Sequence, residues 1–372
     1  RDVLPSRIVA YRPATLDEMC TSGQVVWVGV GSIGAGDGRI RLCFADQLAL
    51  LAPGWDQAEA PDNTIHHALR AHLASRGASF WGQLREAAPD ATDAELLVAL
   101  WDLVWSGEVT NDSLAPLRAL LAGGGVVLKR APKRSGGRPR PARLTRLGPP
   151  AAAGRWSLVQ PLLEPTPTPT EAAHAQALQL LERYGVVTRE TVLAEGVLGG
   201  YASVYGVMKV LEERGRVRRG YFVTGLGAAQ FALPGAVDRL RSARDAVDAD
   251  ISPDRVPPPI VLAATDPAQP FGATLAWPVT AGRPARTATS LVVIRQGRAL
   301  AWFDRRGHHL VMFPAGADDT TWALALADLV RTGRERSIEV RKVDGGEIPE
   351  AVARVLRMSG FADGYRGLVL RA

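Results

Sequence analysis

At 372 residues the chain is longer than one ordinary hydrophobic core supports, so we expect roughly two to four domains. Hydrophobic residues make up 47% of the chain and charged residues 22%, a balance that excludes extensive disorder. The net charge of +6 indicates an anionic partner only where that charge is concentrated.

Nothing in the chain predicts a membrane segment or a disulfide framework. No apolar run approaches the ~20 residues that cross a bilayer, so we expect a soluble protein with no membrane partner. Cys20 and Cys43 occur without a CxxC or a nearby histidine pattern, and two buried thiols fit a reducing cytoplasm. Arg1 stands where a complete chain has Met, and no signal sequence follows, so we expect part of a longer polypeptide.

One short pattern occurs three times: an apolar helical stretch that ends in Gly, followed two positions later by a Val that opens a strand. The copies are ATLDEMCTSGQVVWVG, LWDLVWSGEVTND and VMKVLEERGRVRRGYF, with the glycines at Gly23, Gly107 and Gly215. Residues four and seven positions before each glycine are apolar and share one helical face. The glycine supplies a helix-ending conformation that other residues resist, and the strands begin at Val25, Val109 and Val217.

Further helices precede the second and third copies. They are expected at residues 63–76, 79–88, 171–184 and 188–195. In the third copy, residues 216–224 and 229–233 predict two strands of a hairpin. Three helices followed by a hairpin form a winged helix, which is a helix-turn-helix variant.

A basic segment rich in Gly and Pro interrupts the second copy between residues 123 and 153. It contains no acidic residue and eight basic ones: Lys129, Arg130, Lys133, Arg134, Arg138, Arg140, Arg143 and Arg146. Of the 44 basic residues, the 36 outside this segment nearly balance the 38 acidic ones, so the surplus charge lies here. Strands at 108–110 and 155–159 would form a split wing, and the insertion between them would bind DNA phosphates.

Beyond residue 244, strands alternate with turns. Strands are expected at 260–264, 290–296, 298–304, 309–313, 337–343 and 367–371, with helices at 321–331 and 349–359. This pattern predicts a β-barrel-like module, partly closed or a curled sheet, with two helices. The fold class is therefore expected to be α+β. The expected modules are a winged-helix helix and wing over 1–60, a winged helix with the basic insertion over 61–163, a winged helix over 164–244 and the β-barrel-like module over 245–372.

The third copy also carries the best candidates for DNA contact. Basic residues gather at the end of its last helix and along its wing: Lys209, Arg214, Arg216, Arg218 and Arg219. Winged helices usually meet phosphates there, and the alternative is a solvated surface. Tyr201 and Tyr205 lie four apart on the same helix, where core packing is the preferred interpretation over DNA contact. Core packing is likewise expected for Trp27, Trp81, Trp101, Trp105 and Trp156.

The sequence supports a catalytic or metal site less strongly than DNA contact. Base excision needs a carboxylate that positions water beside a pocket for a flipped base. Asp266, in TDPAQP, and Asp363, in GFADGYRG, are weak catalytic candidates because both stand in turn-forming sequences. His308 and His309 are expected in a hairpin turn, and His66, His67 and His72 on a helix. Adjacent histidines on a strand point to opposite faces and cannot readily hold one ion, so no metal site is expected. The chain contains no GxxxxGK[ST] loop, so no nucleotide cofactor is expected in it.

Four long passages closely resemble the C-terminal region of the Lhr, or large helicase-related, proteins of bacteria. They are VLPSRIVAYRPATLDEMCTSGQVVWVG, LWDLVWSGEVTNDSLAPLRALL, LERYGVVTRETVLAEGVLGGYASVYGVMKVLEERGRVRRGYFVTGLGAAQFALPG and LAATDPAQPFGATLAWP. The resemblance implies a DNA-repair helicase whose motor, with ATP and Mg²⁺, lies N-terminal to these residues. It also implies tandem winged helices and a final β-barrel that promotes tetramer assembly and is similar to AlkZ-type DNA glycosylases. Those enzymes use two glutamines flanking one apolar residue, and this chain has no Gln-x-Gln.

Three interpretations follow. We expect an accessory region that binds DNA non-specifically and promotes homo-oligomer assembly for a helicase. The first alternative is a DNA glycosylase-like module that acts on damaged or deaminated bases. The second is a purely structural scaffold whose winged helices contact other proteins, as many such domains do.

Overall fold

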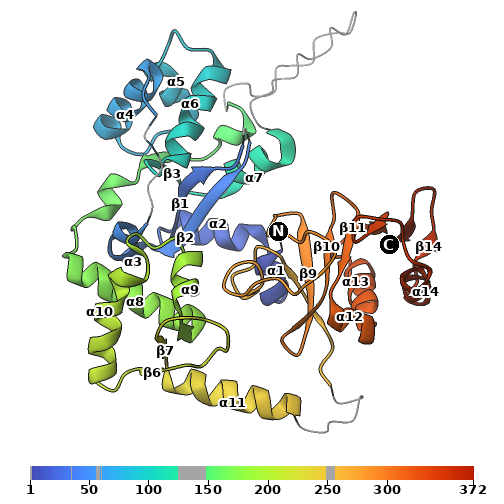
Figure 1. Ribbon diagram of the computed structural model, residues 1–372. Coiled ribbons are helices and arrows are strands. Elements are labelled where there is room, and N and C mark those ends of the chain that lie inside the picture. Colours follow the sequence, from blue (N-terminus) through green and yellow to red (C-terminus); the bar gives the residue numbers. More distant parts are fainter. Residues whose placement is uncertain (1, 35, 56–58, 60, 125–147, 249–255) are drawn as a thin grey trace, which may run out of the picture. The chain divides into compact units, whose positions relative to one another are not determined.

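The computed structural model describes residues 2–34, 36–55, 59, 61–124, 148–248 and 256–372 (Figure 1). The chain divides into two compact units. Residues 12–180 and 195–211 form one, here called the helical unit, and residues 1–11, 181–194 and 212–372 form the other, the sheet unit. Among the described residues, no helix is long and apolar enough to cross a membrane.

The helical unit contains two antiparallel strand pairs among its helices. Its elements are α2 (Pro13–Thr21), β1 (Val25–Ser32), β2 (Gly38–Phe44), α3 (Ala45–Leu51), α4 (Thr64–Arg76), α5 (Trp81–Ala87), α6 (Asp93–Trp105), β3 (Val109–Asn111), α7 (Ala115–Ala119) and β4 (Trp156–Leu158), with α8 (Pro169–Tyr184) and α10 (Gly200–Glu213) continuing beyond it by a few residues. Strand β1 pairs with β2, and β3 pairs with β4.

The helix–glycine–strand repeat is confirmed in all three copies. Gly23, Gly107 and Gly215 have φ values of 73°, 81° and 69°, the left-handed conformation that a side chain resists. Strands β1 and β3 begin at the expected valines. In the third copy Val217 is buried and the strand begins one residue later, at Arg218.

The split wing of the second copy is confirmed as well. Strand β3 pairs antiparallel with β4, with Val109 opposite Leu158 and Asn111 opposite Trp156. The two strands therefore meet across the basic insertion. The basic residues of that insertion, from Lys129 to Arg146, lie outside the described residues.

The five tryptophans expected in the core are all buried, and they share one core. The ring of Trp101 lies 6.4 Å from Trp27, 5.2 Å from Trp105 and 5.7 Å from Trp156 between centroids. Its indole N–H donates to the carbonyl of Ala151 at 3.0 Å, so its polar atom is satisfied in the interior. This core takes residues from both sides of position 60, so α2 and β1 pack in the same interior as α4 to α6.

The sheet unit combines the wing of the third copy with the C-terminal strands. Its elements are α1 (Val3–Arg7), β5 (Val186–Val187), α9 (Arg189–Ala194), β6 (Arg218–Gly220), β7 (Gln230–Ala232), α11 (Pro234–Asp248), β8 (Ile260–Ala263), β9 (Ser290–Arg295), β10 (Arg298–Asp304), β11 (His309–Met312), α12 (Pro314–Asp318), α13 (Thr321–Arg331), β12 (Ser337–Val340), β13 (Lys342–Val343), α14 (Glu350–Met358), β14 (Ala362–Asp363) and β15 (Leu368–Arg371). The predicted hairpin is confirmed as the pair β6–β7, and β5 adds a third strand beside β7.

The C-terminal strands form two sheets rather than one. Five strands follow the order β13-β11-β10-β9-β8 and three follow β12-β15-β14, so the larger sheet has open edges at β13 and β8. No closed barrel is found among the described strands. The mixed α+β class is confirmed. The structure also contains the short helix α12, in addition to the two predicted helices α13 and α14.

The prediction of a single strand over residues 337–343 is wrong, because the structure has two strands there. The chain leaves the smaller sheet after Val340 and enters the larger one at Lys342. Both halves carry buried apolar side chains, so the sequence pattern does not show where one strand ends and the next begins.

Candidate nucleic-acid interface

The predicted DNA-contact residues of the third copy are all exposed. Lys209 lies on α10, while Arg214 and Arg216 occupy the turn around Gly215. Arg218 and Arg219 lie on β6, which leads through the wing into β7 and α11 (Figure 1). The turn and strand therefore present four arginines within six consecutive residues to solvent.

These arginines differ in their charge pairing. Arg219 Nε lies 3.2 Å from Glu212 Oε1, so its charge is already balanced within the protein. Arg214, Arg216 and Arg218 have no acidic partner among the described residues. An unpaired guanidinium at the surface is available to bind phosphate oxygens in two-pronged geometry. Arg216 lies in the turn before β6. The rule that successive side chains of a strand point to opposite faces therefore does not apply to Arg216.

The wing loop is held by a buried side chain that the sequence did not single out. Gln230 is fully buried at the start of β7. Its Oε1 accepts the backbone N–H groups of Phe222 and Val223, each at 2.8 Å, and its Nε2 donates to the Val223 carbonyl at 3.0 Å. Only the folded loop brings these groups together, because they lie seven and eight positions away in the chain.

Asp266, one of the two catalytic candidates, is buried in the sheet unit with both carboxylate oxygens occupied. Arg7 Nη1 donates to Oδ2 at 2.7 Å and Nη2 donates to Oδ1 at 2.5 Å. The backbone N–H of Ala268 also donates to Oδ1, at 2.8 Å. The hydrogen bond that Arg7 donates to the Asp266 carboxylate raises the pKa of the Arg7 guanidinium. This geometry suits a structural ion pair, because the buried carboxylate accepts three hydrogen bonds from the protein and Arg7 balances its charge.

Asp363, the second candidate, is exposed on β14. Its Oδ1 lies 3.0 Å from Arg357 Nη2, and the same guanidinium reaches Glu350 at 3.1 Å. The hydrogen bond to Asp363 is the largest influence that raises the pKa of Arg357. An exposed carboxylate beside an arginine lacks the desolvated surroundings that general acid–base chemistry uses.

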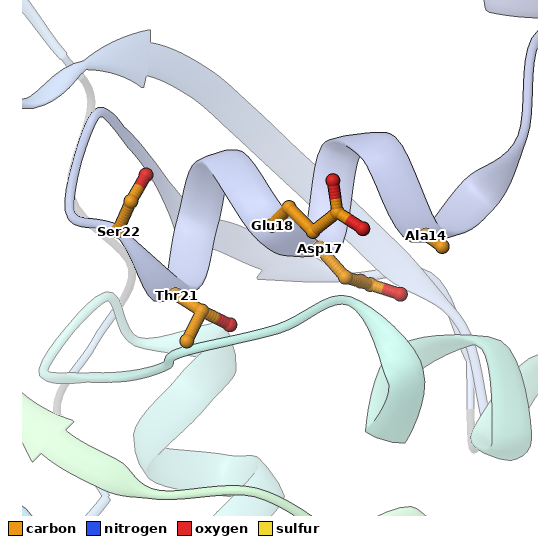
Figure 2. Close-up of a pocket in the computed structure, with 5 residues that line it drawn as sticks. All are labelled: Ala14, Asp17, Glu18, Thr21 and Ser22. Atoms are coloured by element: carbon orange, nitrogen blue, oxygen red, sulfur yellow. The ribbon is translucent and has the colours of Figure 1, made fainter.

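A pocket in the helical unit is lined by one side of α2 and the residue after it (Figure 2). Its lining residues are Ala14, Asp17, Glu18, Thr21 and Ser22. Asp17 accepts the backbone N–H of Leu114 at 2.8 Å and pairs with Arg118. Its carboxylate therefore holds α2 against the segment around α7. Neither Asp266 nor Asp363 lines this pocket.

The histidines, cysteines and tyrosines considered next make contacts within the protein rather than forming a metal or nucleophile site. Within the described part of the chain, no three His, Cys, Asp or Glu side chains gather as metal ligands. His66 Nε2 lies 3.3 Å from Asp102, and His309 Nε2 accepts the Gly345 N–H at 2.8 Å. Burial raises the pKa of both thiols, Cys20 and Cys43, to about 11, which keeps them protonated near neutral pH. Tyr201 and Tyr205 are half-buried, with ring centroids 5.7 Å apart.

Family models and two related proteins match this chain and point to one protein family. Residues 1–45 and 166–251 match two family models, each described as "Large helicase-related protein, winged-helix domain". The chain is 41% identical to "Lhr helicase/ probable uracil glycosylase" of Mycolicibacterium smegmatis over 99% of its length, and 32% identical to "Lhr helicase/uracil glycosylase" of Escherichia coli over 98%. It spans about a quarter of each relative, 25% and 24% respectively. Because both winged-helix models and both relatives point to one group, the chain belongs to the Lhr, or large helicase-related, family.

Proposed function

We propose that this chain is a C-terminal accessory region of an Lhr-type, ATP-dependent DNA-repair helicase, and that it binds DNA without sequence preference. The observation that carries the proposal is the exposed, unpaired set Arg214, Arg216 and Arg218 on the turn and wing of a winged helix. Wings and helix ends of this motif usually contact the DNA backbone. Phosphate contacts position the protein and carry no sequence information, which is why weak sequence preference is expected.

One further lysine and one group of basic residues support the proposal. Lys209 adds an exposed positive charge on α10, and the eight basic residues of the insertion between β3 and β4 add the largest concentration of charge in the sequence. Each phosphate that these residues neutralise releases condensed counterions, so binding should weaken steeply as salt rises. A motor outside this chain would hold ATP and Mg²⁺, because the chain has no phosphate-loop motif.

The test is a measurement of DNA affinity against salt for the double variant Arg216→Ala/Arg218→Ala. We expect lower affinity for several unrelated sequences and a salt slope reduced by roughly one for each lost contact. Arg354→Ala, at an exposed position of α14, controls for the loss of one surface arginine. Arg216→Lys/Arg218→Lys should retain the slope because it keeps the charge. Unchanged affinity and slope in an Ala variant that melts like the parent would overturn the proposal for this wing.

A second candidate function is base excision, favoured by the words "uracil glycosylase" in the names of both relatives. A flipped uracil would need a pocket and a carboxylate able to position water. The carboxylates of Asp266 and Asp363 are paired with arginines, which argues against both as the water-activating group. Incubation of the chain with uracil-containing DNA, followed by assay of free uracil, decides this function. Free uracil above the level of a heat-inactivated sample would establish it.

The proposal also includes self-assembly of the protein and its location in the cytoplasm. Homo-oligomer formation, a tetramer by family resemblance, would place several DNA-binding wings in one particle in the cytoplasm. A scaffold that contacts only proteins is the competing interpretation. Gel shifts at two salt concentrations separate them, since a pure scaffold would not retard DNA at either.

A further inference from the structure

Two adjacent aromatic residues of the wing have opposite surroundings. Phe222 packs against the buried cluster of Val186, Ala232 and Val237. Tyr221, immediately after β6, leaves 86% of its surface exposed. The same short loop thus packs one ring against the buried cluster and presents the other to solvent.

The exposed ring stands on a rigid loop. The three close hydrogen bonds of buried Gln230 fix the backbone of Phe222 and Val223, directly after Tyr221. On the other side, Gly220 lies so close to Phe222 that an added Cβ would come within 3.1 Å of its ring. A ring presented by a pre-formed backbone loses little conformational freedom on binding, which favours contact with a partner.

The charge beside this ring indicates what kind of partner it contacts. Arg216 and Arg218 precede Tyr221 by five and three positions and have no acidic partner among the residues that the structure describes. A planar ring next to unpaired guanidinium groups matches a nucleotide, which has a flat base and an anionic phosphate. Inside a duplex, neighbouring base pairs cover both faces of each base, so away from the duplex ends an unpaired base is needed to offer a face for stacking.

We propose that Tyr221 stacks on an unpaired base of single-stranded or forked DNA while Arg216 and Arg218 hold the neighbouring phosphates. This inference rests on the proposed DNA-binding function and adds a substrate preference to it. The wing would then bind a fork or single-stranded arm more tightly than an uninterrupted duplex of the same length.

The experiment compares forked DNA with a blunt duplex, using the full chain. Tyr221→Ala should lower affinity for the fork about tenfold and affinity for the duplex by less than twofold, while Tyr221→Phe should match the parent because it keeps the ring. Tyr221→Leu, apolar but not aromatic, should resemble the Ala variant. Tyr365→Ala, which removes another tyrosine that is 98% exposed, is the matched control and should have no effect.

A direct reading of stacking comes from 2-aminopurine placed at successive positions of the single-stranded arm. Quenching of its fluorescence at one position should occur with the parent and Tyr221→Phe and be lost in Tyr221→Ala. Equal losses on fork and duplex, or parent-like binding by Tyr221→Ala or Tyr221→Leu, would overturn the inference. If Arg216→Ala/Arg218→Ala still weakens binding in that case, the proposed function stands. If neither change alters binding, DNA contact by this wing fails as well, and capture of a protein by Tyr221 is the remaining explanation.

Discussion

Arg7 and Asp266, 259 positions apart in the chain, form a two-pronged ion pair with N–O distances of 2.7 and 2.5 Å in the sheet unit. Five residues before Arg7, Asp2 makes a second such pair with Arg305, at 2.9 and 2.8 Å. Arg305 also reaches Glu335 at 2.6 Å. The N-terminal segment is therefore attached to the C-terminal module through arginine–carboxylate contacts at both ends of α1.

Replacing Arg7 with Ala should destabilise the sheet unit, because it leaves the buried Asp266 carboxylate with one backbone donor. Loss of hydrogen bonds to a buried charge costs about 1 to 3 kcal/mol, and chemical denaturation should show a decrease of that size. Arg12→Ala, at an exposed arginine, is the control. The companion variant Asp266→Asn should also be less stable. Parent-like stability combined with lost uracil release in that variant would instead assign Asp266 a catalytic role.

Acid should weaken the helical unit partly through Glu108. Arg70 donates to its two carboxylate oxygens at 2.5 and 2.8 Å, and this hydrogen bond lowers the pKa of Glu108 from its ordinary value of 4.5. A carboxylate with a lowered folded-state pKa contributes stability above its unfolded pKa and loses it as pH falls through the folded value. Glu108→Gln should therefore be less stable than the parent at pH 7, and the difference should shrink below about pH 4.5.

Urea denaturation of parent and variant between pH 3 and 7 measures this difference. Glu86→Gln, at an exposed glutamate of α5, controls for the loss of one negative charge. A stability difference for Glu108→Gln that stays constant across the range would contradict the linkage to Arg70.

Deleting residues 129–146 should flatten the salt dependence of DNA binding, because eight of the chain's basic residues lie there. Each lost phosphate contact reduces the slope of log affinity against log salt by about 0.9 on duplex DNA. A shuffled insertion with the same composition should keep the parent slope, since the effect depends on charge and not on order. An unchanged slope after deletion would show that the insertion does not contact phosphate.

We expect the chain to self-associate at micromolar concentration, as the family resemblance implies. Outside the insertion, the chain has 36 basic and 38 acidic residues, so its net charge there is small and long-range repulsion between copies is weak. Light scattering across a concentration series should give a mass above one chain of 39.7 kDa. The deletion variant should associate at least as well as the parent. A monomeric mass at every concentration would count against an assembly role for these residues.

Removing Gln230 should loosen the wing loop specifically. Gln230→Ala leaves the N–H groups of Phe222 and Val223 without their acceptor, and hydrogen exchange at these two amides should become faster. Amides of the β9–β10 pair serve as an internal control and should exchange at the parent rate. Parent-like protection at both loop amides would mean that the loop does not depend on this side chain.

Features of the fold that depend on neighbouring residues could be determined from the sequence alone. The helix–glycine–strand repeat, the split wing and the position of the surplus charge all follow from local periodicity, from the left-handed preference of Gly23, Gly107 and Gly215, and from composition. These signals lie within a few residues of the structure that they specify. Burial of Trp27, Trp101 and Trp105 was predictable for the same reason, because they lie within the copies of the repeat.

Features that depend on distant partners were decided only by the tertiary structure. Asp266 has the same sequence context whether its carboxylate faces water or the guanidinium of Arg7, and only folding brings those groups together across the chain. The division of residues 337–343 between two sheets depends on which strand edges are free to pair, not on side-chain pattern. Gln230 holds the wing loop through backbone groups, and because every residue except proline carries the same N–H donor, no pattern of side chains marks that contact in advance.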